Sequence, residues 1–518
     1  MQPLRRLIPL QIVAAALASC GGGTSPDTAT PVAAPPGRGT LVQNPPQLLK
    51  LVPAGSLLLQ LSLAANQQVL SLGGTPLCDI AVHMVRYRTV GGSNEATEAS
   101  AALMLPTGLD ARCRGSRPIV LYAHGTSSDR NYNIANLDDS QNVEGLILAA
   151  YFASQGWIVV APNFAGYDSS TLTYHPFLNA DQQSKDMIDA LTAARTAIPT
   201  VDAPLTRDNG RLFITGYSQG GHVAMATHRA MQAASLAVTA SAPLSGPYAL
   251  AAFTDAVFGG EVNGSAPLLF TMLLTSYQKS YGNLYASVAD VYEAQYATTI
   301  ESLLPSNLAR SALYAQGKLP SNALFSSTPP DPQFAAMTPA TSPARMAQLF
   351  ALGFGASNLL KNSYRLNYLL DAQANPDGGW PVVTNGVAAA NPANKLRQAT
   401  KLNDLRNWTP AAPILLCGGN EDPTVFWFNT QLMQNYWTTH SPPPAAATIL
   451  LDIDSAASPG DPYASLKSGF SLAKLLLAAT AVAQGANDGG ARAVADAYHS
   501  TLVPPFCLVA ARSFFAAQ

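Results

Sequence analysis

Charge is scarce in this 518-residue chain. Lysine, arginine, aspartate and glutamate together make up 12 % of the residues, and the formal net charge is −2. No stretch is rich in lysine or arginine. Proteins that bind nucleic acids or adsorb to anionic membranes carry such basic stretches. The composition therefore excludes both classes, and no nucleic-acid partner is expected.

Cysteine is scarce as well, with five residues in the chain. No two stand in the C-x-x-C spacing of structural zinc sites, and no motif implies a metal or an organic cofactor. One of the five, Cys20, lies at the end of a targeting segment. The others form an even set, which in an exported protein predicts two disulfides of open connectivity: Cys78, Cys113, Cys417 and Cys507.

Long apolar runs are absent. No stretch reaches the roughly 18 consecutive apolar residues that a membrane-spanning helix requires. The most apolar helical segment, residues 471–483, is predicted to be a buried helix of a soluble domain. Apolar residues still make up 48 % of the chain, which is enough for a large core.

The N-terminus has the pattern of an export signal. Arg5 and Arg6 precede an apolar stretch over residues 7–17, which is too short to span a bilayer. The sequence Leu17-Ala18-Ser19-Cys20 resembles the lipobox of bacterial lipoproteins. We therefore expect a signal peptide over residues 1–19 and a lipid anchor on Cys20. An ordinary secretory signal with a chance cysteine is the alternative.

Residues 20–46 are rich in Pro, Ala, Thr and Gly, and we predict that they form a flexible tether. The residue after the cysteine is Gly21 rather than Asp. In this respect the sequence resembles lipoproteins that are sent on to the outer membrane. The expected location is the outer membrane, with the folded part in the periplasm or at the cell surface.

Beyond the tether, short apolar segments alternate with helical patterns. Residues 118–123, 157–161 and 211–215 have the pattern of buried strands, and residues 143–155 and 181–197 that of helices. This alternation predicts an α/β fold with a mostly parallel sheet between layers of helices. Further strands are expected at residues 80–90, 96–105, 238–244, 413–417 and 447–452.

The strand pattern is lost between residues 249 and 400, where Ala, Leu, Tyr and Pro predominate with helical spacing. The simplest organisation is one α/β domain, formed by residues 47–248 and 401–518, with a helical insertion at 249–400. The insertion contains candidates for lining an acyl pocket, which would otherwise form its own core: residues 268–274, Tyr277, Tyr281 and Tyr285.

The sequence Gly216-Tyr-Ser-Gln-Gly220 follows the strand at 211–215 and precedes a helix. A G-x-S-x-G motif in that context predicts a sharp turn, which presents Ser218 at the carboxyl edge of the sheet. A serine hydroxyl becomes a good nucleophile when a base removes its proton and an acid orients that base. The N–H of Gln219, at the start of the next helix, would then donate to the oxyanion.

Chain order selects the partners of Ser218. Asp422 follows the strand at 413–417 and is the expected acid. Of the seven histidines, His499 follows the last predicted strand, and it is the expected base. The order Ser218, Asp422, His499 is that of the α/β-hydrolase triad. The adjacent Glu421 is expected to point elsewhere, and two carboxylates at the end of the next strand remain alternatives for the acid: Asp452 and Asp454.

Together with His124-Gly125-Thr126, these motifs make residues 75–518 resemble the α/β-hydrolase superfamily. Within it, residues 161–167 (APNFAGY), 175–183 (HPFLNADQQ) and 403–408 (NDLRNW) look similar to the secretory-lipase group and related bacterial lipoprotein esterases. The resemblance implies an α/β-hydrolase fold in which the insertion is a helical cap or lid. It also implies the N–H of Thr126 as the second oxyanion donor.

The expected function is that of a serine-dependent carboxylic-ester hydrolase, an esterase or lipase that acts through an acyl-enzyme on a small-molecule or lipid ester. A serine peptidase on the same fold is one alternative, because the same triad serves amides and esters. Nothing charged or amine-binding near the motifs favours it. The other alternative is a surface lipoprotein that binds ligands without turnover. The presence of all three triad residues argues against it, because a binding protein does not need them.

The expected triad also selects a pairing of the cysteines. Cys417 lies five residues before Asp422, and Cys507 lies eight residues after His499. If the acid and the base meet, these two cysteines are neighbours. The remaining two then pair with each other: Cys78 and Cys113.

A first prediction concerns the anchor. The protein should partition with membranes and carry lipid on Cys20, whereas Cys20→Ser should release it or leave the signal peptide uncleaved. Cell fractionation followed by intact-mass analysis measures both outcomes. Unmodified wild-type protein found entirely in the soluble periplasm would contradict the prediction.

Overall fold

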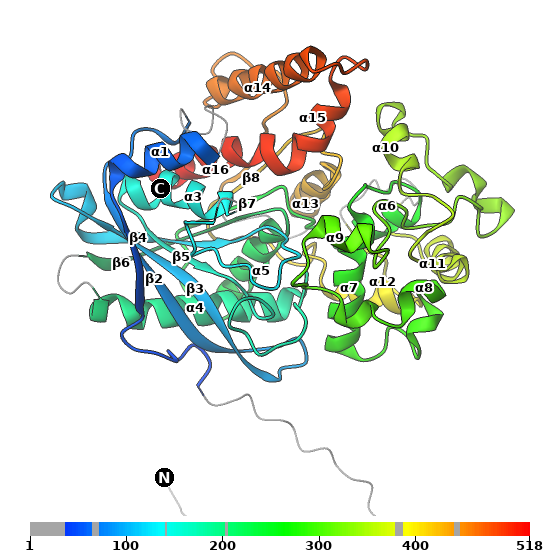
Figure 1. Ribbon diagram of the computed structural model, residues 1–518, viewed down its shortest axis with the longest axis horizontal. Coiled ribbons are helices and arrows are strands. Elements are labelled where there is room, and N and C mark those ends of the chain that lie inside the picture. The colour runs from blue at the N-terminus through cyan, green and yellow to red at the C-terminus, as the bar shows by residue number, and fades with distance from the viewer. Residues whose placement is uncertain (1–36, 65–71, 140–141, 202–205, 379–386, 440–445) are drawn as a thin grey trace, which may run out of the picture. The chain divides into compact units, whose positions relative to one another are not determined.

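A single sheet runs through the protein, which is described here by a computed structural model covering residues 37–64, 72–139, 142–201, 206–378, 387–439 and 446–518 (Figure 1). Within these residues nine strands follow the order β1-β2-β3-β5-β4-β6-β7-β8-β9. Their bounds are β1 Gln47–Val52, β2 Asp79–Val90, β3 Ala96–Thr107, β4 Gly115–Ala123, β5 Ile158–Pro162, β6 Thr206–Tyr217, β7 Ala240–Leu244, β8 Ile414–Gly418 and β9 Thr448–Asp452.

The sheet is mostly parallel. Strands β5, β4, β6, β7, β8 and β9 pair in parallel, and β1, β2 and β3 add an antiparallel edge next to β5. The short central strands β5, β7 and β8 are buried along their whole length. Strands covered on both faces favour apolar residues at nearly every position, and the one polar side chain in these three strands, Ser241 of β7, is hydrogen-bonded to His228.

Helices cover both faces of the sheet. Side chains of α4 (Ala180–Val201) and α5 (Gln219–Ala233) form one apolar cluster with β4, β5 and β6. Side chains of α3 (Val143–Tyr151) and α16 (Val503–Ala516) form another with the opposite face. The remaining helices of the α/β part are α1 Ala54–Ala64, α13 Phe428–Thr439, α14 Ala464–Ala483 and α15 Ala491–Ala497. The α/β fold expected from the alternating pattern is thus confirmed.

The described residues between β7 and β8 include no named strand and several helices, and they have their own apolar cluster, centred on buried side chains such as Phe258, Leu274 and Tyr368. In Figure 1 these green and yellow helices lie beside the sheet. The described chain nevertheless forms one compact unit that includes them. The helices are α6 Leu250–Phe258, α7 Ala266–Tyr281, α8 Ala294–Ala297, α9 Arg310–Ala315, α10 Ala347–Ala351, α11 Asn362–Ala374 and α12 Lys395–Leu402.

The folded part begins earlier than the composition suggests. Residues 37–46, assigned to the tether, contact β2 and α4: the N–H of Val42 donates to the carbonyl of Arg86 in β2, and Arg38 pairs with Asp189 of α4 at 2.9 Å. Strand β1, which the sequence pattern does not predict, follows directly. Residues 1–36, with Cys20 and the signal segment, lie outside the described residues.

The prediction that residues 471–483 form a buried helix is wrong. They belong to α14, in which Phe470 and Ala473 are the buried residues. Three leucines of this helix are about half exposed or more: Leu472 (53 %), Leu475 (67 %) and Leu476 (49 %). By length and composition α14 could cross a membrane, yet it lies along the outside of the domain. An apolar helix is fully buried only where other elements of the fold pack against all of its sides. Helix α14 is largely exposed because it packs against the domain through one narrow stripe.

Both disulfides join the expected cysteines. Cys78 is bonded to Cys113, and Cys417 is bonded to Cys507. The second bond ties β8 to α16 and closes a loop of 90 residues, and both of its cysteines are fully buried. The first bond ties the segments that precede β2 and β4, at the opposite edge of the sheet from Ser218.

A second prediction separates the two bonds. Replacing Cys417 and Cys507 together by Ala should lower the free energy of unfolding by about 4–5 kcal/mol, because the unfolded chain regains the entropy of a large loop. The same variant should also lose part of the expected esterase activity, since this bond joins the segments carrying Asp422 and His499. Urea unfolding and activity below the transition measure both effects.

The matched control replaces Cys78 and Cys113 by Ala. That variant should lose stability but keep its activity, because its bond lies away from the site. Equal activity loss in the two double variants would contradict the prediction.

Candidate active site

Ser218 lies in a tight turn between β6 and α5. Its backbone has φ 60° and ψ −120°, a conformation that a residue with a side chain adopts at a cost. The turn allows close packing: a Cβ on Gly220 would lie 1.9 Å from the carbonyl oxygen of Ala123 in β4. The glycines of the motif are therefore required by space, and the strained turn presents the serine hydroxyl at the carboxyl edge of the sheet.

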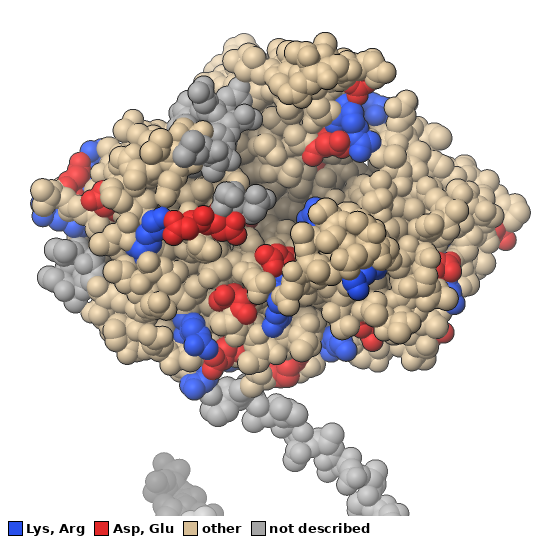
Figure 2. All heavy atoms as spheres, viewed as in Figure 1, with Lys and Arg blue, Asp and Glu red and all other residues tan. Residues whose placement is uncertain are grey.

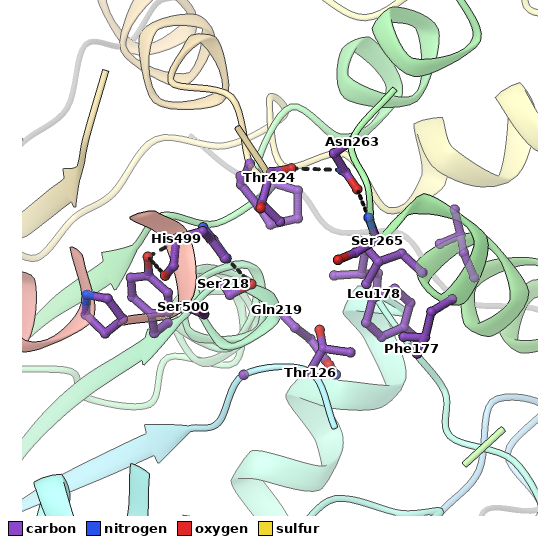
Figure 3. A pocket seen from close by; sticks show the side chains of 18 of the residues that line it. Thr126, Phe177, Leu178, Ser218, Gln219, Asn263, Ser265, Thr424, His499 and Ser500 are labelled. Carbon is purple, nitrogen blue, oxygen red and sulfur yellow. Dashed lines mark hydrogen bonds between the residues drawn. The ribbon is translucent and has the colours of Figure 1, made fainter. Parts of the chain in front are cut away.

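The structure brings the three expected residues together, and Figure 3 shows two of them, Ser218 and His499. His499 Nε2 lies 2.8 Å from Ser218 Oγ, and His499 Nδ1 lies 2.6 Å from Asp422 Oδ2. The carboxylate accepts from Nδ1–H, which leaves Nε2 as the acceptor for the serine hydroxyl. A proton can therefore pass from serine to imidazole while the carboxylate faces the charge that results.

Asp422 is fixed from both sides. Its side chain is 1 % exposed. Oδ1 accepts hydrogen bonds from the N–H groups of Thr424 (2.9 Å) and Val425 (3.0 Å), and Oδ2 faces His499. The local turn after β8 thus aims one oxygen of the carboxylate at the imidazole.

The other candidate acids have different partners. Glu421 is half exposed and lies 3.7 Å from Lys474, and Asp454 also pairs with Lys474. Asp452 accepts from the backbone and side chain of Asn420. None of these three carboxylates has a recorded contact with His499 in the described part of the chain. His440 lies outside the described residues.

The two expected oxyanion donors lie at the cavity that Ser218 faces. Thr126 and Gln219 both line it, and within the described residues neither backbone N–H has a protein acceptor. The loop before Thr126 is held by Glu144, whose Oε1 accepts from the N–H of Gly125 at 3.0 Å and from the hydroxyl of Tyr122. Burial raises the pKa of Glu144.

A buried histidine holds the Gln219 side chain. Gln219 Nε2 donates to His175 Nε2 at 2.6 Å, and His175 Nδ1 donates to the carbonyl of Ala165 at 2.9 Å. Burial lowers the pKa of His175 to about 3, so the ring is neutral and its Nε2 is an acceptor. His175 belongs to the 175–183 segment that carries part of the family resemblance, but no pattern in the sequence indicates its role.

The cavity has a volume of about 470 Å³ and is mainly apolar. One wall comes from α6 and α7 of the insertion and includes Leu250, Leu268, Leu269 and Leu273. Another comes from Phe177 and Leu178, which the sequence analysis did not single out. Thr126, Asn263, Ser265 and Thr424 place polar groups on the lining.

The proposed role of the three tyrosines is wrong. Tyr277, Tyr281 and Tyr285 are not among the residues that line this cavity. Tyr277 donates to the carbonyl of Leu178, Tyr281 accepts from Asn403, and Tyr285 donates to Glu301. All three pack in or against the insertion's own apolar cluster, which is the alternative that the sequence left open, and the hydrogen bonds of Tyr277 and Tyr281 reach the α/β part.

Comparison with solved structures gives a similar fold over most of the chain. The rice cell wall degrading esterase LipA from Xanthomonas oryzae is 25 % identical, covering 92 % of this chain and 98 % of its own, with a TM-score of 0.64. A putative hydrolase from Legionella pneumophila is 17 % identical over 92 % and 97 % of the two chains, with a TM-score of 0.59. No protein-family model and no curated protein matches the sequence. The fold is therefore one used by esterases and hydrolases.

A third prediction follows from the geometry of Ser218. A fluorophosphonate should form an adduct on Ser218 alone, because this hydroxyl lines the cavity and has an imidazole as base, whereas the Ser241 hydroxyl, which also meets an imidazole, is fully buried. Ser218→Ala should give no adduct, and His499→Ala should slow labelling by about 10³-fold or more. Peptide mass mapping and the labelling rate measure these effects.

Ser500 provides the matched control. It lines the same cavity, but its hydroxyl contacts Thr501 rather than a base. Ser500→Ala should therefore be labelled like the wild type. An adduct on Ser500, or on Ser218 at an unchanged rate in His499→Ala, would refute the assignment.

Proposed function

We propose that this protein is a serine-dependent carboxylic-ester hydrolase (EC 3.1.1 type). The observation that carries the proposal is the hydrogen-bonded series Asp422–His499–Ser218, whose serine and histidine line a mainly apolar cavity. Two backbone N–H groups beside them have no protein acceptor among the described residues. The likeness to an esterase over 92 % of the chain supports it. An apolar cavity suits an acyl chain, and no observation favours a peptide or a ligand without turnover.

In the proposed acylation step, Ser218 Oγ attacks the ester carbonyl carbon while His499 Nε2 takes the serine proton. The carbonyl π electrons move onto oxygen, and the N–H groups of Gln219 and Thr126 donate to the oxyanion. The tetrahedral intermediate collapses, the C–O bond to the alcohol breaks, and His499 returns the proton to the leaving alkoxide oxygen. Asp422 keeps the imidazole in the required tautomer throughout.

Deacylation repeats these steps with water as the nucleophile. His499 Nε2 takes a proton from water, the hydroxide oxygen bonds to the acyl carbon, and the second tetrahedral intermediate releases Ser218. The proton on His499 then goes to Ser218 Oγ, and a carboxylic acid leaves. This scheme needs no metal or organic cofactor.

The insertion contributes the substrate's apolar contacts in this proposal. Because α6 and α7 line the cavity, residues 249–400 would act as a cap that selects the acyl group. The Xanthomonas protein is described as degrading a plant cell wall, so polymeric esters belong in a substrate survey beside lipid and aryl esters.

Export fits the proposed enzyme. Disulfides form and persist in oxidising compartments, so the two bonds support a location of the folded part outside the cytoplasm. We propose that Cys20 anchors it to the outer membrane, as in bacterial lipoprotein esterases. On the face seen in Figure 2, charged side chains of both signs are scattered among uncharged ones, without a basic patch.

A fourth prediction tests the reaction. Ser218→Ala should lower kcat for an ester substrate by about 10⁴- to 10⁶-fold, and Asp422→Asn by about 10⁴-fold, with folding retained. Steady-state kinetics on a panel of esters and peptides, with circular dichroism as the folding check, measure the effect. Near-normal ester turnover by Ser218→Ala, or turnover of peptides but not esters, would overturn the proposal.

A further inference from the structure

We infer that Tyr498, together with Asp454 and Lys474, positions the acid–base pair of Asp422 and His499. The inference rests on the proposed function, and it gives a role to the long segment between β9 and His499. None of these three side chains lines the cavity, so they act through the residues beside them.

Tyr498 directly precedes the base and touches the loop of the acid. It begins a π-helical turn, Tyr498–Leu502, and is 1 % exposed. Its hydroxyl accepts from the N–H of Glu421 at 3.3 Å, and Glu421 directly precedes Asp422. One hydroxyl therefore connects the residue before the acid with the residue before the base, 77 residues apart in the chain.

The packing around Tyr498 leaves little freedom. A Cβ on Gly419 would lie 2.2 Å from the Tyr498 hydroxyl oxygen, so the acid loop lies directly against this ring. On its other side the ring meets Phe470 of α14 edge-on, with the ring centroids 5.6 Å apart. Tyr498 is thus enclosed between the acid loop and α14.

Asp454 and Lys474 fix the direction of the hydroxyl. Tyr498 donates to Asp454 Oδ2 at 2.6 Å, and the other carboxylate oxygen lies 2.5 Å from Lys474 Nζ. The side chain of Asp454 is 5 % exposed, so its charge depends on this cation. Burial and the hydrogen bond to Asp454 raise the pKa of Tyr498, so its hydroxyl stays protonated and continues to donate.

Lys474 makes α14 part of this arrangement. Its ammonium lies 5.5 Å from the Phe470 ring centre, 5.9 Å from that of Tyr498, and 3.7 Å from Glu421 Oε2. The inward stripe of α14 therefore holds the loop of Asp422 and the turn of His499 against each other. A second tyrosine, Tyr217, holds that turn from the serine side by donating to the carbonyl of His499 at 2.6 Å.

A positioning role is tested by measuring kcat. A mutation distant from the reacting atoms that misplaces a catalytic group by about 1 Å can reduce turnover by about 10²-fold. Tyr498→Phe removes one oxygen atom and both hydrogen bonds. We expect kcat to fall by about 10- to 100-fold while KM stays the same. The rate of fluorophosphonate labelling of Ser218 should fall in parallel, and the low-field proton resonance of His499 Nδ1–H should shift or disappear.

Two further variants probe the ion pair. Lys474→Met leaves Asp454 without its cation and should lower kcat in the same direction, whereas Lys474→Arg should restore most of the rate. The matched control is Tyr292→Phe in the insertion, which also deletes a buried hydroxyl, one without a hydrogen-bond partner among the described residues. It should leave kcat, the labelling rate and the resonance unchanged.

The inference fails if Tyr498→Phe keeps kcat and the labelling rate within about twofold of the wild type, because a misplaced acid–base pair should cost far more than that. It also fails if kcat, KM and thermal stability all worsen together in Tyr498→Phe and Tyr292→Phe alike, as a structural role predicts. If the wild type hydrolyses no ester faster than Ser218→Ala, the proposed function fails. In that case the labelling rate and the resonance still decide the role of Tyr498.

Discussion

The hydrogen bond between Asp422 Oδ2 and His499 Nδ1 is the contact on which the rest of the site depends. It joins segments 77 residues apart, and the imidazole is aligned with Ser218 only while it is held there. Each nearby structural feature acts on one end of this bond. The turn after β8 aims the carboxylate, the Cys417–Cys507 bond ties the two segments, and Tyr217 and Tyr498 hold the turn of the base.

The parallel sheet explains why these segments converge. The carboxyl ends of parallel strands lie at one edge, so the loops after β4, β6 and β8 meet there although they are distant in sequence. Ser218 follows β6, Thr126 follows β4, and Asp422 follows β8. The cost of the strained Ser218 backbone is offset by the packing of β6 and α5 against β4, which only glycine at positions 216 and 220 permits.

The insertion between β7 and β8 is the first of two long segments near the site, and the chain between β9 and His499 is the second. They contact the site in different ways. Helices α6 and α7 of the first supply one wall of the cavity, which makes the insertion the part of the fold where acyl preference would be set. Helix α14 of the second contacts the site through its inward stripe and exposes leucines on the outside. In Figure 2 the ridge that α14 occupies in Figure 1 is almost without charged side chains.

Local features and the order of motifs along the chain could be predicted before the fold was known. Strand and helix patterns, the elbow at Ser218, and the order of Ser218, Asp422 and His499 could all be derived, because they depend on neighbouring residues and on chain connectivity. The cysteine pairing followed from that order. Tertiary structure alone decided that Phe177 lines the cavity, that the insertion's tyrosines do not, that α14 is exposed, and that Tyr498 meets Glu421 and Asp454. These are contacts between side chains far apart in the chain, and no periodicity encodes them, because they depend on which surfaces the folded backbone brings face to face.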